Sequence, residues 1–183
     1  MTQNLQKFLF NVDDYYKLAA VGIIGSHDKV ELIKGEVVNM SPSNSMHAHV
    51  IDVLNRKFSK SDDALFFIRI QNPLRIDNYS EPEPDVLLVN PKSYKDQHPT
   101  PDDVLILIEV SASTLKFDQT IKKELYAEAG IPEYWIVNLI EQKVEVYNTP
   151  EKNTYLNESS FGLKDVIFGK QAGFQLNVGD LFE

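Results

Sequence analysis

The sequence contains no cysteine, so disulfide bonds, thiolate-bound zinc and cysteine nucleophiles are all excluded. This absence is typical of a reducing compartment, and we predict a cytoplasmic location. The first ten residues, MTQNLQKFLF, have neither a basic start nor a long apolar stretch, so no signal peptide is expected. No segment approaches the roughly 20 consecutive apolar residues of a membrane-spanning helix.

Basic residues are scarce. The 18 Lys and Arg residues stand against 27 Asp and Glu residues, which gives a formal net charge of −9. Phosphate backbones are normally bound by clustered Lys and Arg, so the surface as a whole is poorly suited to nucleic acid. A nuclease is not excluded, because a bound cation reverses the local charge at carboxylates. Any path for nucleic acid must therefore be a local feature.

The composition is that of a globular protein, with 43% apolar and 25% charged residues in a chain of 183. No repeat, low-complexity tract or linker divides the sequence, so we expect a single domain over residues 1–183.

Hydrophobic periodicity predicts the order helix, hairpin, helix, several strands, helix, strands, which is a mixed α/β domain with a central sheet flanked by helices. The predicted helices cover residues 12–20, 45–59 and 117–129, and a predicted hairpin with Gly35 at its turn covers 29–40. The predicted strands cover residues 64–71, 85–89, 104–110, 133–139 and 143–147. Residues 73–76 continue or pair with the first strand, and weaker strand signals lie near 155 and 166–168.

Glu109 is the residue that folding alone explains least. It lies near the end of VLILIEV, the most apolar predicted strand, and parity places it on the face of Leu105 and Leu107. A buried carboxylate without a partner costs several kcal/mol or takes up a proton. A metal ion or another cation near Glu109 is therefore expected.

Asp85 has a similar position, because it opens a short apolar strand behind Pro82 and Pro84. If the two strands are neighbours, Asp85 and Glu109 lie side by side. Two converging carboxylates make a hard-oxygen site suited to Mg²⁺ or Mn²⁺, which we predict as the cofactor. Such an ion polarises a phosphoryl oxygen and generates a hydroxide nucleophile.

A cation is available from the helix that follows. Asp118, Lys122 and Tyr126 are spaced i, i+4, i+8 and share one helix face, which predicts that Lys122 points toward the sheet. A lysine there can orient the attacking water and stabilise the negative charge on phosphorus. Glu36, just after the turn at Gly35, could add a carboxylate or hold Lys122.

Other polar residues have weaker claims. His47 and His49 are two positions apart on a helix, so they do not share a metal, and helix capping is the more ordinary role for His47. Gln71 ends a strand and could reach the site. Ser111 and Ser113 have no histidine base nearby in sequence, which disfavours a serine hydrolase. We expect core positions for two aromatic residues, Tyr134 and Trp135.

Asp85 and Glu109 with a nearby lysine resemble the PD-(D/E)xK nuclease signature. Pro84-Asp85 matches its first half, whereas Glu109-Val110-Ser111 has serine where the signature has lysine. The chain more closely resembles a large bacterial family of restriction endonuclease-like proteins that is abundant in cyanobacteria. The resemblance covers roughly residues 10–148 and is carried by ELIKGEVVNMSPSNSMHAHV, EPDVLLV and LIEVSASTLKFDQTIKKELYAEAGIPEYWIVN.

The resemblance implies the restriction-endonuclease-like fold, with the missing lysine supplied by the helix as Lys122, and His47 matches the family's histidine. We therefore predict a metal-dependent endonuclease acting on DNA, with catalytic Asp85, Glu109, Lys122 and Glu36, and with His47 and Gln71 as possible substrate contacts. The alternatives are a nuclease-like domain that does not cut and serves in binding or assembly, or a cleaving enzyme that acts on RNA or an unusual nucleotide. By analogy with restriction enzymes, we expect a homodimer.

Overall fold

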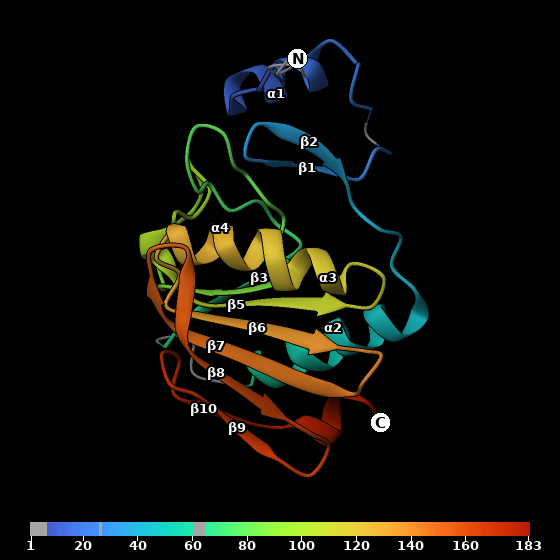
Figure 1. Cartoon of the computed structure of the whole chain (residues 1–183), viewed down its shortest axis with the longest axis vertical. Helices are drawn as coiled ribbons and strands as arrows, with labels where there is room; N and C mark the ends of the chain where they lie inside the picture. The colour runs from blue at the N-terminus through green and yellow to red at the C-terminus, as the bar shows by residue number, and fades with distance from the viewer. Residues whose placement is uncertain (1–6, 26, 61–64) are drawn as a thin grey trace, which may run out of the picture.

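A six-stranded mixed sheet forms the centre of the molecule (Figure 1). The computed structural model describes residues 7–25, 27–60 and 65–183. The strand order is β3-β4-β5-β6-β7-β8, and β5 and β6 are the parallel pair. The strands are β3 (Phe67–Ile70), β4 (Val86–Val89), β5 (Val104–Ser111), β6 (Glu133–Asn138), β7 (Lys143–Glu151) and β8 (Thr154–Phe161).

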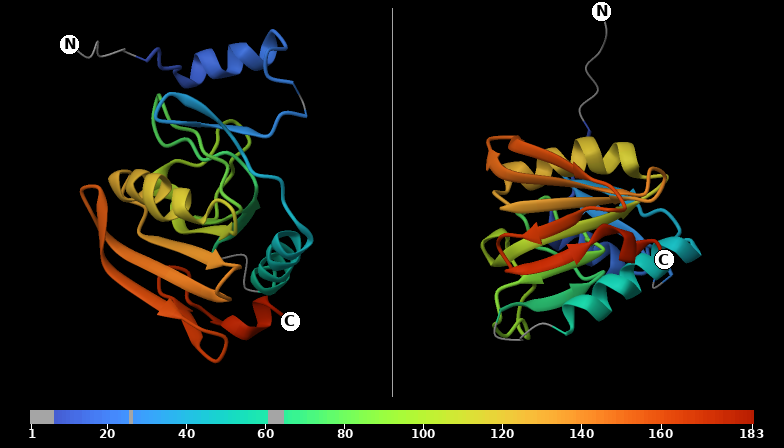
Figure 2. Two further views of the ribbon diagram at one scale, coloured as in Figure 1. Left: turned by 45° about the vertical axis from the view of Figure 1, so that its right-hand side comes forward. Right: turned by 90° about the horizontal axis from the view of Figure 1, so that it is seen from below.

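Both faces of this sheet are covered, as the continuous apolar sequence of β5 predicts (Figure 2). On one face, α2 (Ser45–Phe58) packs with a small sheet of β9 (Val166–Gly169) and β10 (Phe174–Asn177), and η3 (Val178–Leu181) closes this layer. On the other face, α4 (Lys123–Glu128) packs over a tyrosine-rich core that includes the buried Tyr134. Trp135 is also fully buried, so both aromatic predictions are confirmed.

The helix between β5 and β6 is not continuous. It consists of α3 (Leu115–Phe117), a π-helical turn η2 (Asp118–Lys122) and α4. The sequence predicted one helix over 117–129. The π turn inserts an extra residue into the helical repeat, a feature that often accompanies functional sites. It carries two buried charged residues, Asp118 and Lys122.

The N-terminal elements lie at one end of the molecule, and their hairpin packs there on the core beside α4, with Ile33 buried (Figures 1 and 2). They are α1 (Val12–Ala20) and a hairpin of β1 (Val30–Ile33) and β2 (Glu36–Asn39). The predicted turn is confirmed, because Lys34 and Gly35 both have positive φ angles, 47° and 79°. Backbone pairing of Leu32 with Glu81 connects the hairpin to the rest of the chain.

Several sequence predictions need correction. Residues 73–76 form no strand, whereas β8 is a full strand that the sequence indicated only weakly. The pairing of β4 with β5 shifts at Leu105, which is an extra residue, so Leu105 packs on the α2 face while Leu107 packs under α4. Position 64, the start of one predicted strand, lies outside the described residues.

In the described parts of the chain, no helix is both long and apolar enough to cross a bilayer. A short 3-10 turn, η1 (Pro101–Asp103), precedes β5.

Candidate active site

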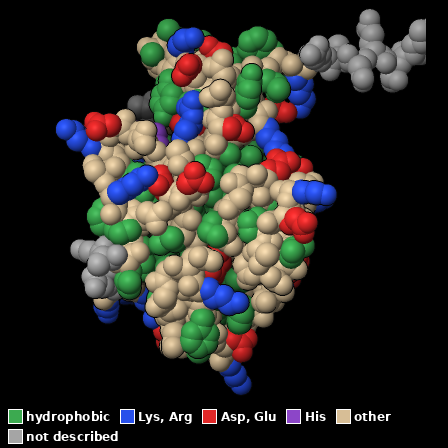
Figure 3. Space-filling model, turned by 90° about the vertical axis from the view of Figure 1, so that its left-hand side faces the viewer, with side chains coloured by type: hydrophobic (Ala, Val, Ile, Leu, Met, Phe, Trp, Pro, Cys, Tyr) green, Lys and Arg blue, Asp and Glu red, His purple; other side chains and the backbone are tan. Residues whose placement is uncertain are grey.

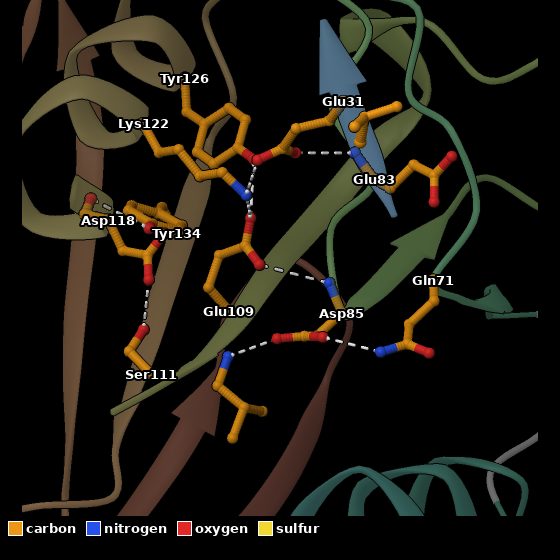
Figure 4. Close-up of polar contacts among 12 residues, drawn as sticks. Glu31, Gln71, Glu83, Asp85, Glu109, Ser111, Asp118, Lys122, Tyr126 and Tyr134 are labelled. Atoms are coloured by element: carbon orange, nitrogen blue, oxygen red, sulfur yellow. Dashed lines mark hydrogen bonds and ion pairs between the residues drawn. The ribbon is translucent and has the colours of Figure 1, made fainter. Parts of the chain in front are cut away.

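Asp85, just before β4, lies beside Glu109 near the end of the neighbouring strand β5 (Figure 4). The antiparallel pairing of β4 and β5 matches Val86 with Ile108, which brings the start of β4 beside the end of β5. The backbone N–H of Asp85 points to Oε2 of Glu109 at 3.4 Å. The two residues are only 7% and 4% exposed. The structure therefore brings together the two carboxylates that the sequence singled out.

Asp85 is held as a carboxylate by three donors. Its Oδ2 accepts from the backbone N–H of Val110 at 2.9 Å and lies 3.1 Å from Nε2 of His47, while Oδ1 accepts from the side-chain amide of Gln71 at 3.2 Å. Burial alone would raise the pKa of Asp85, but the bonds from His47, Val110 and Gln71 outweigh it and lower that pKa. An ionised Asp85 requires the hydrogen on Nε2 of His47.

The pKa of Glu109 is shifted in the opposite direction to that of Asp85. Its Oε1 accepts from Nζ of Lys122 at 3.0 Å and from the hydroxyl of Tyr126 at 2.8 Å. Burial raises the pKa of Glu109 to about 8, against the opposing charge of Lys122, and the charges of Asp118 and Asp85 raise it further. Among residues 7–25, 27–60 and 65–183, the one donor to Oε2 is the N–H of Asp85, at the long distance of 3.4 Å. This oxygen is therefore the least satisfied acceptor of the pair.

Lys122 connects two buried carboxylates. Its Nζ lies 3.0 Å from Oε1 of Glu109 and 3.0 Å from Oε1 of Glu31 on β1. Burial lowers the pKa of Lys122, but the charges of Glu109, Glu31 and Asp118 outweigh burial and raise it. Lys122 therefore stays protonated, so it can orient or neutralise an oxygen but cannot accept a proton.

Glu36, a predicted member of the site, lies elsewhere. It is on the exposed side of the hairpin, with a half-exposed side chain that pairs with Lys7 at 2.9 Å. Glu31 occupies the position next to Lys122 instead, and its Oε2 also accepts from the N–H of Glu83 at 3.2 Å. The signal for Glu31 was present in the sequence, since it is a charged residue inside the apolar strand VELI, as Glu109 is in VLILIEV.

Contacts with two strands of the sheet hold the π turn, which carries Lys122, in place. Asp118 accepts from the hydroxyl of Ser111 at 2.7 Å, and the hydroxyl of Tyr134 donates to the carbonyl of Asp118 at 3.2 Å. Burial raises the pKa of Asp118, and the charge of Lys122 opposes this. Ser111 stands where the nuclease signature has lysine, and here it anchors the turn that carries Lys122.

A pocket of about 530 Å³ opens over these residues. Asp85, Glu109 and Lys122 line it together with His47 and Gln71. Its other walls come from the hairpin, the segment that leads from β2 to α2, and the segment that follows β5. A small molecule or part of a polymer can therefore reach the two carboxylates.

The donor set fits a hard divalent cation. Within residues 7–25, 27–60 and 65–183, no three His, Asp or Glu side chains gather closely enough to hold an ion by themselves. Mg²⁺ is usually bound by one or two carboxylates together with waters and substrate phosphates, and Asp85 with Glu109 supplies two. Carboxyl groups are also in excess, because Glu31, Glu109 and Asp118 lie around the single ammonium of Lys122, and Asp85 lies beside Glu109.

A mixed sheet between helices, with this connectivity, is the restriction-endonuclease-like fold, and a solved structure shares it. That structure is described as a "putative nuclease belonging to DUF820" from Anabaena variabilis ATCC 29413. It has a TM-score of 0.71 and 15% sequence identity, over 94% of this chain and 97% of that chain. Residues 12–179 match the family Uma2, described as "Putative restriction endonuclease", and the chain belongs to this family. No curated protein matches the sequence.

Proposed function

We propose that the protein is an endonuclease that hydrolyses phosphodiester bonds of DNA with the help of Mg²⁺ or Mn²⁺. The observation that carries the proposal is the adjacent pair Asp85 and Glu109 on the floor of a pocket, with the ammonium of Lys122 bound to Glu109. Membership of the Uma2 family and the nuclease-like fold support it.

Each residue has a proposed role. Asp85 and Glu109 hold the cation through Oδ1 of the one and Oε2 of the other, the oxygens with the fewest partners. The bound cation would polarise the phosphoryl group and acidify a water. Lys122 keeps Glu109 in place and offers its positive charge to the phosphate as negative charge develops. His47 and Gln71 orient the carboxylate of Asp85.

Cleavage of a labelled DNA with and without Mg²⁺ or Mn²⁺ tests the proposal. We expect metal-stimulated cleavage that falls at least a hundredfold in Asp85→Asn and in Glu109→Gln. Glu36→Gln is the matched control, because this carboxylate is exposed and outside the pocket. Full activity in both site variants would contradict the proposal. An RNA of the same sequence, included as a parallel substrate, distinguishes the two nucleic acids.

A second candidate is a nuclease-like domain that binds but does not cut. The observation in its favour is that Lys122 is already shared by Glu109 and Glu31. Calorimetric titration with Mn²⁺ separates the two functions. No binding at millimolar Mn²⁺ favours the domain that does not cut, whereas micromolar binding that is lost in Asp85→Asn favours the enzyme.

Three further predictions accompany this proposal. The protein acts as a homodimer, residues 1–183 form one domain, and the location is cytoplasmic. Light scattering at increasing protein concentration checks the first of these, and a monomer at the highest concentration would contradict it.

A further inference from the structure

The two site carboxylates line the pocket, and both are almost fully buried. Its volume, about 530 Å³, is within the range of about 300–1,000 Å³ that is typical of pockets for small molecules. Because the carboxylates of Asp85 and Glu109 are almost fully buried, a thin, unpaired strand can bring a phosphate to them more easily than a duplex can.

The charge of the lining also disfavours a duplex. A duplex is held by many Lys and Arg contacts along both phosphate backbones. Among the described residues that line the pocket, the basic ones are Lys29 and Lys122, and Lys122 is engaged by Glu109 and Glu31. Six acidic residues line the same pocket: Asp28, Glu31, Glu83, Asp85, Glu109 and Asp118.

The face drawn in Figure 3, on the side of the molecule away from the pocket, carries no cluster of basic residues among its described residues. There the Lys and Arg side chains lie singly, with Asp and Glu side chains between them, and they form no continuous band. The formal net charge of −9 agrees with this distribution. The lining of the pocket and the net charge together favour a ligand that needs few phosphate contacts.

The remaining lining suits an unpaired strand. Tyr15 and Phe117 place aromatic rings in the wall, and unpaired bases stack on such rings whereas the bases of a duplex are already stacked. The hydroxyl of Tyr15 donates to the carbonyl of Val30, which fixes the position of this ring. Neutral amide and hydroxyl groups supply hydrogen bonds to sugars and bases, from Asn39, Ser41, Ser43, Asn44, Ser113 and Thr114.

We infer that the pocket takes an unpaired DNA strand, in the form of a single-stranded segment or a flap, in preference to an intact duplex. This inference rests on the proposed function and specifies its substrate.

Fluorescence anisotropy with three labelled DNAs of one sequence tests the inference. The probes are a single strand, a blunt duplex and a duplex with a single-stranded flap. Binding is measured in Ca²⁺, a hard cation that also takes oxygen ligands, and cleavage is measured in Mn²⁺. We expect the single strand and the flap to bind at least tenfold more tightly than the blunt duplex, and cleavage to fall within the unpaired part.

Two variants test the role of the pocket wall itself. Phe117→Leu keeps an apolar side chain but removes the flat ring, and we expect about fivefold weaker binding of the single strand. Tyr79→Leu is the matched control, because Tyr79 is exposed and lies outside the pocket lining. Lys29→Gln should reduce the salt dependence of binding by about one phosphate contact.

The outcomes separate this inference from the proposed function. Equal or tighter binding of the blunt duplex, or cleavage inside the duplex, overturns the inference and leaves the nuclease proposal standing. Tighter binding of the single strand without any cleavage supports the inference and contradicts the nuclease proposal. No measurable binding of the single strand overturns the inference.

Discussion

The ammonium of Lys122 lies 3.0 Å from Oε1 of Glu109, although the two residues are on different elements, the π turn and strand β5. Both side chains are almost completely buried. Two opposite charges in such a place stabilise each other only while both are present, because the partner left behind by a substitution would be a buried, unpaired charge.

Removal of this ammonium should therefore destabilise the protein as well as abolish cleavage. For Lys122→Met we expect the free energy of unfolding to fall by about 3–5 kcal/mol, measured by urea denaturation above about pH 8, where Glu109 is ionised. The double variant Lys122→Met with Glu109→Gln should recover part of this loss without recovering cleavage. Lys116→Met, at an exposed position on α3, is the control and should stay within about 0.5 kcal/mol. Equal stability of all three variants would contradict a coupled buried pair.

The raised pKa of Glu109 predicts a pH dependence of stability. Its pKa rises from an ordinary 4.5 to about 8 in the folded protein, so the folded state binds more protons than the unfolded state between these values. The metal-free protein should therefore lose stability, on the order of a few kcal/mol, as the pH rises from about 4.5 through about 8. Asp85 does not contribute in this range, since its pKa is lowered and its effect lies at more acidic pH.

Urea denaturation in EDTA across this pH range checks that dependence. Glu109→Gln removes the titrating group, so its stability should change less with pH than that of the wild-type protein. Mn²⁺ should displace the proton from Glu109, so its affinity should increase with pH up to about 8. Parallel stability curves for the variant and the wild type would rule out Glu109 as the titrating group.

The two glutamates of the hairpin should differ sharply in their effect. Glu31 is buried against Lys122, and loss of a residue that orients a site in this way typically reduces activity about 10- to 100-fold. We expect this loss of cleavage in Glu31→Gln and a change of less than about twofold in Glu36→Gln. Both changes remove one negative charge from the same hairpin, so the net charge is matched. Similar activity of the two variants would contradict the assignment of Glu31 to the site.

Most of the site could be predicted from the sequence, because its residues are charged side chains in segments whose apolar neighbours predict burial. Asp85 and Glu109 are carboxylates at the ends of apolar strands, and Lys122 shares a helical spacing with Tyr126. Glu31 is likewise a charged residue in an apolar strand. Glu36 was predicted instead because it is next to the turn, although the pattern of burial favours Glu31. The Lys34-Gly35 turn was predictable because glycine readily takes the positive φ angle that such a turn requires, and Gly35 has one, 79°.

The features that the sequence did not predict depend on tertiary contacts. The π turn has no local signature, because its extra residue is accommodated by Asp118, which is held by Ser111 and Tyr134 from neighbouring strands. The shift at Leu105 likewise becomes visible only once β4 pairs with β5. Strand β8 was weakly predicted because it lies at the edge of the sheet and exposes most of its residues.

The π turn is also tied to the sheet at Gln119, and this contact should influence cleavage. The side-chain amide of Gln119 donates to both carboxylate oxygens of Glu145 on β7, at 3.1 and 2.8 Å. Gln119→Glu would place two like charges in contact and push the turn, together with Lys122, away from the sheet. A displacement of about 1 Å can reduce the rate a hundredfold, so we expect kcat to fall at least tenfold while KM changes little.

The double variant Gln119→Glu with Glu145→Gln restores one amide and one carboxylate at the same contact and should recover most of the lost kcat. A double-mutant cycle on kcat measures this recovery directly. Glu145 is also bound by the hydroxyl of Tyr147 and by Lys143, so Glu145→Gln alone should reduce stability somewhat. Stability must therefore be measured for each variant. If the double variant is as slow as Gln119→Glu while its stability is normal, the contact between Gln119 and Glu145 does not position Lys122.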